Sequence, residues 1–265
     1  MERASETIGH ELAILAHEIR EPLASILFAV DCTNQAGHDE LANRRMCEII
    51  ERQARYLAGI IEDVLDASQA KHGKLSLHKE LIDVGSVVAA AIETNFPRLT
   101  KRKHRLTLSL PQEPILLIAD RQRVQQIINN LLTNACKYTQ AGGTICVAAK
   151  TDREFVSIEV RDTGIGISPE ALPRVFDIYR QGAERREGGF SGLGIGLALV
   201  KSLVELHGGS VTAHSGGPGT GSSFVVRFPG AITVCGTNPN LDGYALVSGF
   251  SDHAAAMKLG ITTAA

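Results

Sequence analysis

Apolar residues follow a helical period along two stretches near the start of the chain. They recur every three or four positions from about residue 5 to 33 and again from about 40 to 70, which predicts two long amphipathic helices. The first stripe consists of Ile8, Leu12, Leu15, Ile19, Leu23, Ile26 and Val30, and the second of Met46, Ile50, Leu57, Ile60, Ile61 and Val64. Asn34 to Gly37 breaks the pattern and predicts a turn. Two such helices form a hairpin that buries little alone, so we expect two copies to complete a four-helix bundle.

The pattern changes after His72 and Gly73, where short alternating segments mix with shorter helical ones. Strands are predicted at about 75–77, 106–110, 115–119, 144–150, 154–161, 209–214 and 222–228. Helices are predicted at about 84–96, ending at Pro97, and at about 121–136 and 193–207. This mixture predicts an α/β two-layer sandwich with a mixed sheet. We therefore expect a helical hairpin over 1–72, a linker over 73–80, the sandwich over 81–229, and a tail of unknown role over 230–265.

Composition narrows the class of protein. The 265 residues carry a net charge of −2, which gives no electrostatic basis for binding nucleic acid. The five cysteines form no Cys-x-x-Cys pair, so we expect a reducing, cytoplasmic setting rather than disulfides or zinc. No apolar run reaches the roughly 18 residues that cross a bilayer. We expect contact with a membrane only if a longer parent carries an upstream anchor.

His17 is the first candidate for chemistry. It lies roughly 160° from the centre of its helix's apolar stripe, so we expect it to face solvent. A neutral imidazole is a good nucleophile near pH 7, and the adjacent Glu18 could accept its other ring proton or orient the ring. Pro22 should bend the helix just beyond it. The alternative interpretation is an ordinary surface histidine.

Polar residues line one face of the helix predicted at 121–136. These residues are Arg123, Gln126, Asn130, Asn134 and Lys137. Asparagine amides offer the hard oxygen ligands that Mg²⁺ prefers, and a lysine offers a positive charge to phosphate. Asparagine is also a mediocre helix former, so two in mid-helix need a reason. The alternative is a solvated outer face.

Two glycine-rich segments follow. Asp162, at the end of a predicted strand, could accept a hydrogen bond from an adenine amino group, while Gly164 and Gly166 let the backbone approach a flat ring. The segment 188–197, with Gly192, Leu193, Gly194 and Gly196, runs into a helix, and the backbone N–H groups of such a turn bind anions. The alternatives are an ordinary turn and a flexible linker.

Together these motifs resemble the sensor histidine kinases of two-component systems, over roughly residues 8–229. The residues His17 to Leu23 resemble the phosphoacceptor box of that family, and Asn130 to Thr139 resemble its asparagine box. The segments 162–167 and 192–197 resemble its glycine boxes, and Phe176 with Arg180 its phenylalanine box.

The resemblance implies an ATP-dependent kinase that phosphorylates His17 and passes the phosphoryl group to an aspartate of a response-regulator receiver domain. It implies ATP and Mg²⁺ as cofactors, with Asn134 binding the metal and Asn130 close by. Lys137 and Arg180 would contact phosphates, Tyr138 would pack near the adenine, and Asp162 would recognise its amino group. It also implies a homodimer.

Two features depart from the family's pattern. Glu21 stands four residues after His17, where family members that also dephosphorylate their partner carry Thr or Asn, so we expect weak or absent phosphatase activity. In the tail, Asn238 to Leu246 resembles part of a receiver domain, but the tail is too short for a whole one.

Two other functions compete with the kinase. An ATP-hydrolysing conformational switch on the same nucleotide fold would release free phosphate and would not need His17. A dimeric scaffold with a dead nucleotide site would bind no ATP. Autophosphorylation, with the acid and alkali lability of the product, separates the three.

Overall fold

The fold was analysed in a computed structural model, which describes residues 2–36, 39–71, 75–152, 154–177, 194–232 and 262–263. The side chains of residues 2–14, 17, 35, 36, 71, 231, 232, 262 and 263 lie outside that description. The predicted segment from Ile178 to Leu193, including Arg180, Gly192 and Leu193, and nearly all of the tail also lie outside it.

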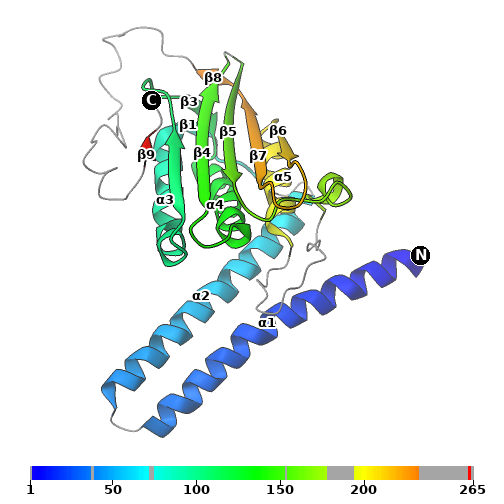
Figure 1. The fold of residues 1–265 in the computed structure, drawn as a ribbon. Helices are drawn as coiled ribbons and strands as arrows, with labels where there is room; N and C mark the ends of the chain where they lie inside the picture. The colour runs from blue at the N-terminus through cyan, green and yellow to red at the C-terminus, as the bar shows by residue number, and fades with distance from the viewer. Residues whose placement is uncertain are drawn as a thin grey trace.

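Two long helices form the expected hairpin, α1 (Glu2–Ala36) and α2 (Glu40–Lys71). They lie side by side and extend away from the rest of the molecule (Figure 1). Asp39 starts α2, because its Oδ1 accepts hydrogen bonds from the backbone N–H groups of Leu41 and Ala42 at 3.1 and 3.0 Å. Pro22 lies inside α1, which continues through it.

The rest of the described chain is an α/β domain. Its strands are β1 (Glu80–Asp83), β2 (Arg105–Ser109), β3 (Leu116–Ala119), β4 (Thr144–Thr151), β5 (Phe155–Asp162), β6 (Ser210–His214), β7 (Ser222–Pro229), β8 (Ala231–Ile232) and β9 (Thr262–Thr263). Its helices are α3 (Val84–Lys101), α4 (Arg121–Tyr138) and α5 (Gly196–Leu206), with a 3₁₀ turn at Leu172–Arg174.

The strands form two sheets. The larger has the order β6-β7-β5-β4-β2-β9, and it is mixed, because β2 runs parallel to β4 and β9 whereas the other neighbours are antiparallel. The smaller, β1-β3-β8, is antiparallel. Helices α3, α4 and α5 cover one face of the larger sheet (Figure 1). The predicted hairpin followed by a two-layer sandwich with a mixed sheet is confirmed.

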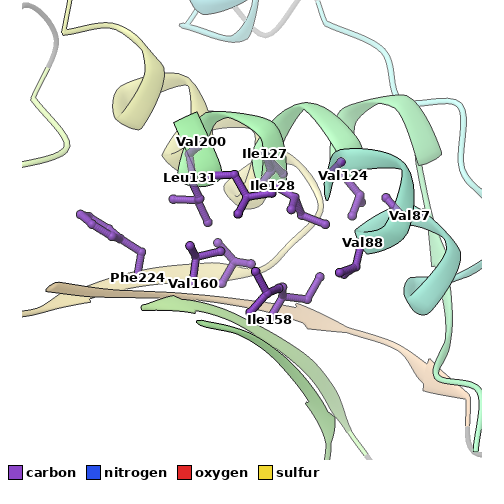
Figure 2. Packing of buried hydrophobic residues seen from close by; sticks show 14 of the residues in the cluster. Val87, Val88, Val124, Ile127, Ile128, Leu131, Ile158, Val160, Val200 and Phe224 are labelled. Carbon is purple, nitrogen blue, oxygen red and sulfur yellow. The ribbon is translucent and has the colours of Figure 1, made fainter. Parts of the chain in front are cut away.

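An aliphatic core lies between helices and sheet. Val124, Ile127 and Ile128 of α4 point toward Ile158 and Val160 of β5 (Figure 2). All five side chains are almost completely buried. The apolar face predicted for this helix is therefore its core face, and the opposite face is available for polar interactions.

Two local predictions were wrong. Residues 75–77 form no strand, because this segment has no pairing partner and is instead fixed by burial of Leu75 and by a hydrogen bond from the His78 N–H to Asp120 Oδ2 at 2.9 Å. Pro97 does not end its helix, which continues to Lys101. A proline removes one N–H donor from a helix, and the packing of Leu99, which is 3% exposed, keeps the next turn helical.

Candidate active site

Helix α4 carries most of the predicted site, and its first turn is tied to three parts of the fold. Asp120 caps it by accepting the Arg123 N–H at 3.1 Å, and its other oxygen accepts the His78 N–H from the segment after α2. The Asp120 N–H donates to Nε2 of buried His207 at 3.1 Å. Burial lowers the pKa of His207, which keeps that nitrogen an acceptor at neutral pH.

The last turn of α4 is held by residues that follow α3. The Arg102 guanidinium donates to the carbonyls of Cys136 and Lys137 at 2.5 and 2.8 Å, and a His104 ring nitrogen lies 3.2 Å from the first of these. A cation at the carboxyl end of a helix binds carbonyls that have no partner within the helix. Both ends of α4 are therefore fixed, which fixes the positions of the polar residues between them.

Asn130 and Asn134 lie one turn apart on α4, and both are half-buried. Within the described part of the chain, neither amide makes a hydrogen bond, and Nδ2 of Asn130 is shielded from solvent. A buried amide without a partner is costly, so the two side chains are suited to a polar ligand. Amide oxygens are suitable ligands for Mg²⁺, which keeps several waters and phosphate oxygens around itself.

Helix α5 begins beside Asn130. A Cβ added to Gly196 would lie 3.4 Å from Asn130 Oδ1, so the two helices meet closely at this point. Among the described residues, no side chain caps the first turn of α5, and Gly194 just before it has a φ of +67°. The free N–H groups of such a turn favour an anion. The structure thus brings Gly196 close to Asn130, and the phosphate-binding role of this segment stays a prediction.

Lys137 and Tyr138 end the helix on the same side. The Lys137 ammonium lies 5.0 Å from the centre of the Tyr138 ring, and Tyr138 is 37% exposed. A lysine near an exposed aromatic ring offers both a charge for phosphate and an apolar surface for a base. The two roles implied for these residues stay predictions.

Asp162 ends β5 and is buried. Its carboxylate accepts the Gly164 N–H at 2.7 Å and the Ser222 hydroxyl at 2.5 Å, so both oxygens are oriented. Gly164 lies against the end of α4, because an added Cβ would come within 2.5 Å of the Tyr138 carbonyl oxygen. The predicted strand-end carboxylate and the tyrosine of α4 are therefore neighbours.

One partner of this loop was not predicted. Gly166 has a φ of +72°, and a Cβ there would lie 2.1 Å from the carbonyl oxygen of Gly217. The Gly219 N–H donates to Ile165 at 2.6 Å and the Gly221 N–H to Gly164 at 3.1 Å. The glycine-dense stretch 215–222 was the available signal, and it supplies both this backing loop and Ser222.

Arg123 and Gln126 do not join the asparagines. The Arg123 guanidinium forms an ion pair with Asp66 of α2, and Gln126 Nε2 donates to the same carboxylate at 2.9 Å. Sequence periodicity had placed all five polar residues of α4 on one face. The face is shared, because its first two turns contact the hairpin and its last two remain beside α5 and Asp162.

In the hairpin, the side chain of His17 lies outside the described residues. Glu18 is 5% exposed and faces α2, where it interacts with the Tyr56 hydroxyl. Burial and then the charges of Glu18 and Glu21 raise the pKa of Tyr56. The predicted role of Glu18 beside the imidazole remains a prediction.

Two family models match the chain in sequence order. The model described as "His Kinase A (phospho-acceptor) domain" covers residues 7–73, and the one described as "Histidine kinase-, DNA gyrase B-, and HSP90-like ATPase" covers residues 119–232. Asp66 falls within the first match, and the described site residues of α4, β5 and α5 fall within the second.

The individual relatives and solved structures that this chain resembles are also histidine kinases. The sensor histidine kinase TrcS of Mycobacterium tuberculosis is 36% identical over 81% of this chain and 42% of its own length. Full-length ShkA, solved in complex with AMPPNP, has a TM-score of 0.62 at 27% identity, covering 85% of this chain and 47% of that one. Histidine kinase ThkA, solved with response regulator protein TrrA, shares the fold with a TM-score of 0.60 at 22% identity, covering 86% of this chain and 63% of that chain. The chain spans less than half the length of the first curated relatives it matches.

Proposed function

Because this chain belongs to the sensor histidine kinases of two-component systems, we propose that it is an ATP-dependent autokinase. In this proposal it phosphorylates His17 and donates the phosphoryl group to an aspartate of a response-regulator receiver domain. The observation that carries the proposal is the close approach of Asn130 to the start of α5, with Asn134 one turn further along α4 and a buried, oriented Asp162 beside the end of that helix. This arrangement offers a metal–triphosphate site along the second half of α4 and an adenine site at its carboxyl end.

Binding and orientation come from residues of the α/β domain, which we take as 81–229. Asp162 would accept a hydrogen bond from the adenine amino group, because its carboxylate is already oriented by Gly164 and Ser222. Asn134, with Asn130 beside it, would hold Mg²⁺, which supplies charge neutralisation for the triphosphate when bound. Lys137, Arg180 and the glycine segment containing Gly192 and Leu193 would bind phosphate oxygens.

Phosphoryl transfer depends mainly on positioning and on neutralising charge. The His17 nucleophile belongs to the hairpin, which we take as residues 1–72, so the two domains must approach each other across the 73–80 linker. Nε2 of His17 would attack the γ-phosphorus as its bond to the β,γ-bridging oxygen breaks and ADP leaves, with Glu18 orienting the ring or accepting its other proton. Glu21 would disfavour hydrolysis of the phosphorylated partner, because its carboxylate repels an aspartyl phosphate.

The hairpin is also the basis for proposing a homodimer. Several large apolar side chains of α1 and α2 remain exposed in the single chain, namely Leu23, Leu27, Phe28, Leu41, Ile61 and Leu65. Phe28 is the most open of them, at 68%. A second copy that packed its own hairpin against these residues would bury them in a four-helix bundle.

The cellular compartment of the protein is also a proposal. None of the helices that the structure describes is long and apolar enough to span a bilayer. Among the described residues, Cys32, Cys47, Cys136 and Cys146 are free thiols, which favours a reducing compartment such as the cytoplasm.

Labelling from γ-labelled ATP tests the proposal. We expect His17→Gln to abolish incorporation while leaving the affinity for a non-hydrolysable ATP analogue unchanged, because the residue lies on the other domain. Asn134→Ala should lose both labelling and magnesium-dependent affinity. The product should be labile in acid and stable in alkali, as a phosphoramidate is. Label that persists in His17→Gln would identify a different acceptor and refute the assignment.

A further inference from the structure

Asn95 is a completely buried polar residue in the second half of α3. It is 0% exposed, whereas the other buried residues of this helix are all aliphatic. Burying an amide costs free energy unless hydrogen bonds replace those that it made with water. An aliphatic side chain of similar size would fill the same place without that cost. The amide therefore needs a reason beyond packing.

The Asn95 side chain makes four hydrogen bonds, and two of them cross to α4. Its Nδ2 donates to the Ala91 carbonyl and to Asn129 Oδ1, both at 2.9 Å. Its Oδ1 accepts the Thr133 hydroxyl at 3.1 Å and the Arg98 guanidinium at 3.3 Å. Because a guanidinium can only donate and a carbonyl can only accept, the amide cannot be turned over. One orientation of Asn95, with α4 in one position beside it, satisfies all four bonds.

The two partners on α4 are direct neighbours of the proposed magnesium ligands. Asn129 and Thr133 lie one turn apart, and each immediately precedes one of the asparagines of the site, Asn130 and Asn134. Successive residues of a helix are about 100° apart, so the asparagines form the adjoining stripe of the same two turns. Two bonded points one turn apart fix both the rotation and the height of that stretch. Whatever fixes the first stripe therefore also fixes the direction of the second.

Other contacts between α3 and α4 control this rotation less closely. Aliphatic side chains of both helices pack in the core (Figure 2), and apolar contacts are not directional. At the start of α4, Arg121 donates to the Ser86 hydroxyl at 3.1 Å in an exposed position, and Arg102 binds the carbonyls of the last turn. Within the described chain, the polar contacts with α3 that hold the middle of α4 are those of Asn95.

We propose that Asn95 is a positioning residue for the magnesium site, acting through its buried hydrogen bonds to α4. These bonds hold the rotation of the helix at which Asn134, with Asn130 beside it, presents its amide oxygen to the metal. The inference rests on the proposed function of this site. Mg²⁺ demands near-ideal octahedral geometry at about 2.0–2.1 Å, so a small rotation of α4 weakens its binding.

The magnesium dependence of nucleotide binding separates this role from ordinary stabilisation. The proposed adenine contact uses Asp162, whose carboxylate is oriented by Gly164 and Ser222 rather than by α3. Loss of the Asn95 bonds should therefore weaken the part of the affinity that depends on the metal and leave the metal-free affinity unchanged. A contact that only stabilises the fold would leave the ratio of the two affinities unchanged.

The test measures the dissociation constant of the non-hydrolysable analogue AMPPNP for the full chain, once with magnesium and once with EDTA. Asn95→Leu keeps the volume and removes all four bonds. We expect the gain in affinity due to magnesium to fall about fivefold or more, while the value in EDTA stays within about twofold. The rate of autophosphorylation at saturating ATP should fall in parallel.

Two further variants sharpen the test. Thr133→Val removes one bond and little volume, so it should give a smaller loss of the same kind, and little further loss when added to Asn95→Leu. Thr94→Val is the matched control, because Thr94 is exposed on α3 and donates to the Ala90 carbonyl of its own helix. It should leave both dissociation constants unchanged.

Each outcome decides something. A folded Asn95→Leu variant with the same magnesium gain as the parent overturns the positioning role and leaves the kinase intact. Equal losses with magnesium and with EDTA also overturn it, because the residue would then act on the site as a whole. A parent chain that binds no AMPPNP, or binds it equally well without magnesium, overturns the proposed nucleotide–metal site and this inference with it. If Asn95→Leu does not fold, as judged by circular dichroism, Thr133→Val carries the same test with the same expected sign.

Discussion

Gly166 is the residue on which the adenine-side loop depends most directly. Its φ of +72° favours glycine, and its α-carbon faces the carbonyl of Gly217 so closely that no side chain fits. Gly219, nearby, has a φ of +82° but open space around it. Substitutions at the two positions therefore distinguish the cost of backbone strain from the cost of a steric clash.

We expect Gly166→Ala to lower the free energy of unfolding by about 2–4 kcal/mol and to weaken nucleotide binding, because the loop must shift. Gly219→Ala should cost only about 1 kcal/mol, from the backbone conformation alone. Urea unfolding of both variants measures the difference. Equal losses would show that the close approach to Gly217 contributes nothing.

Asp63 makes stability depend on pH. Its pKa of about 6 in the folded chain lies above its ordinary value of 3.8, so the folded state binds its proton more tightly than the unfolded state does. The resulting cost is absent below about pH 3.8, grows as the pH rises to about 6, and is constant above that.

Asp63→Asn should therefore stabilise the protein at pH 7.5, by roughly 1–2 kcal/mol, and by less at pH 5. Urea unfolding at the two pH values provides the measurement. Asp31→Asn, at an exposed position of α1, is the matched control. A gain for Asp63→Asn that is the same at both values would mean that the carboxyl is not perturbed by burial.

At the scale of single elements, sequence periodicity predicted which face of a helix is buried better than it predicted which residues contact each other. The core face of α4, with Val124, Ile127 and Ile128, followed directly from spacing, because apolar burial needs only one side of a helix. The polar face could not be divided in advance. Whether Arg123 meets a phosphate or Asp66 depends on where α2 lies, which is a long-range property.

Short elements were missed for the same reason. Strand β1 has only four residues and exists because it pairs with β3, so its own alternation gives little signal. The segment 75–77 alternates well but has no partner. Pairing, rather than pattern, decides at this length.

The α1–α2 hairpin leads to a prediction about assembly. Phe28→Asp places a charge on its most exposed large apolar side chain, and we expect it to shift the chain from dimer to monomer, since burying an unpaired charge in a bundle is costly. Sedimentation equilibrium measures the association constant. Ile118→Asp, at an exposed site on β3, is the control and should leave the dimer intact. An unchanged dimer in Phe28→Asp would place the subunit interface elsewhere.

At the scale of the whole molecule, Asp120 connects the parts. It caps α4, bonds the segment that follows α2 through His78, and reaches α5 through His207. A displacement of the hairpin that moves residues 75–79 would therefore also move the start of α4, the helix that carries the asparagines. Sequence reasoning identified the two domains, but it had no means of finding this connection, because its members are up to 129 residues apart.

The pairing of Asp66 with Arg123 also bears on how such proteins can be rebuilt. Engineers commonly exchange the catalytic half of one signalling enzyme for that of another and join the halves within the intervening linker. Here such a graft would place Asp66 and Arg123 on opposite sides of the junction, so that the two residues would come from different parents. A chimera made from this chain should therefore carry both positions from one parent, so that the ion pair and the hydrogen bond from Gln126 are kept.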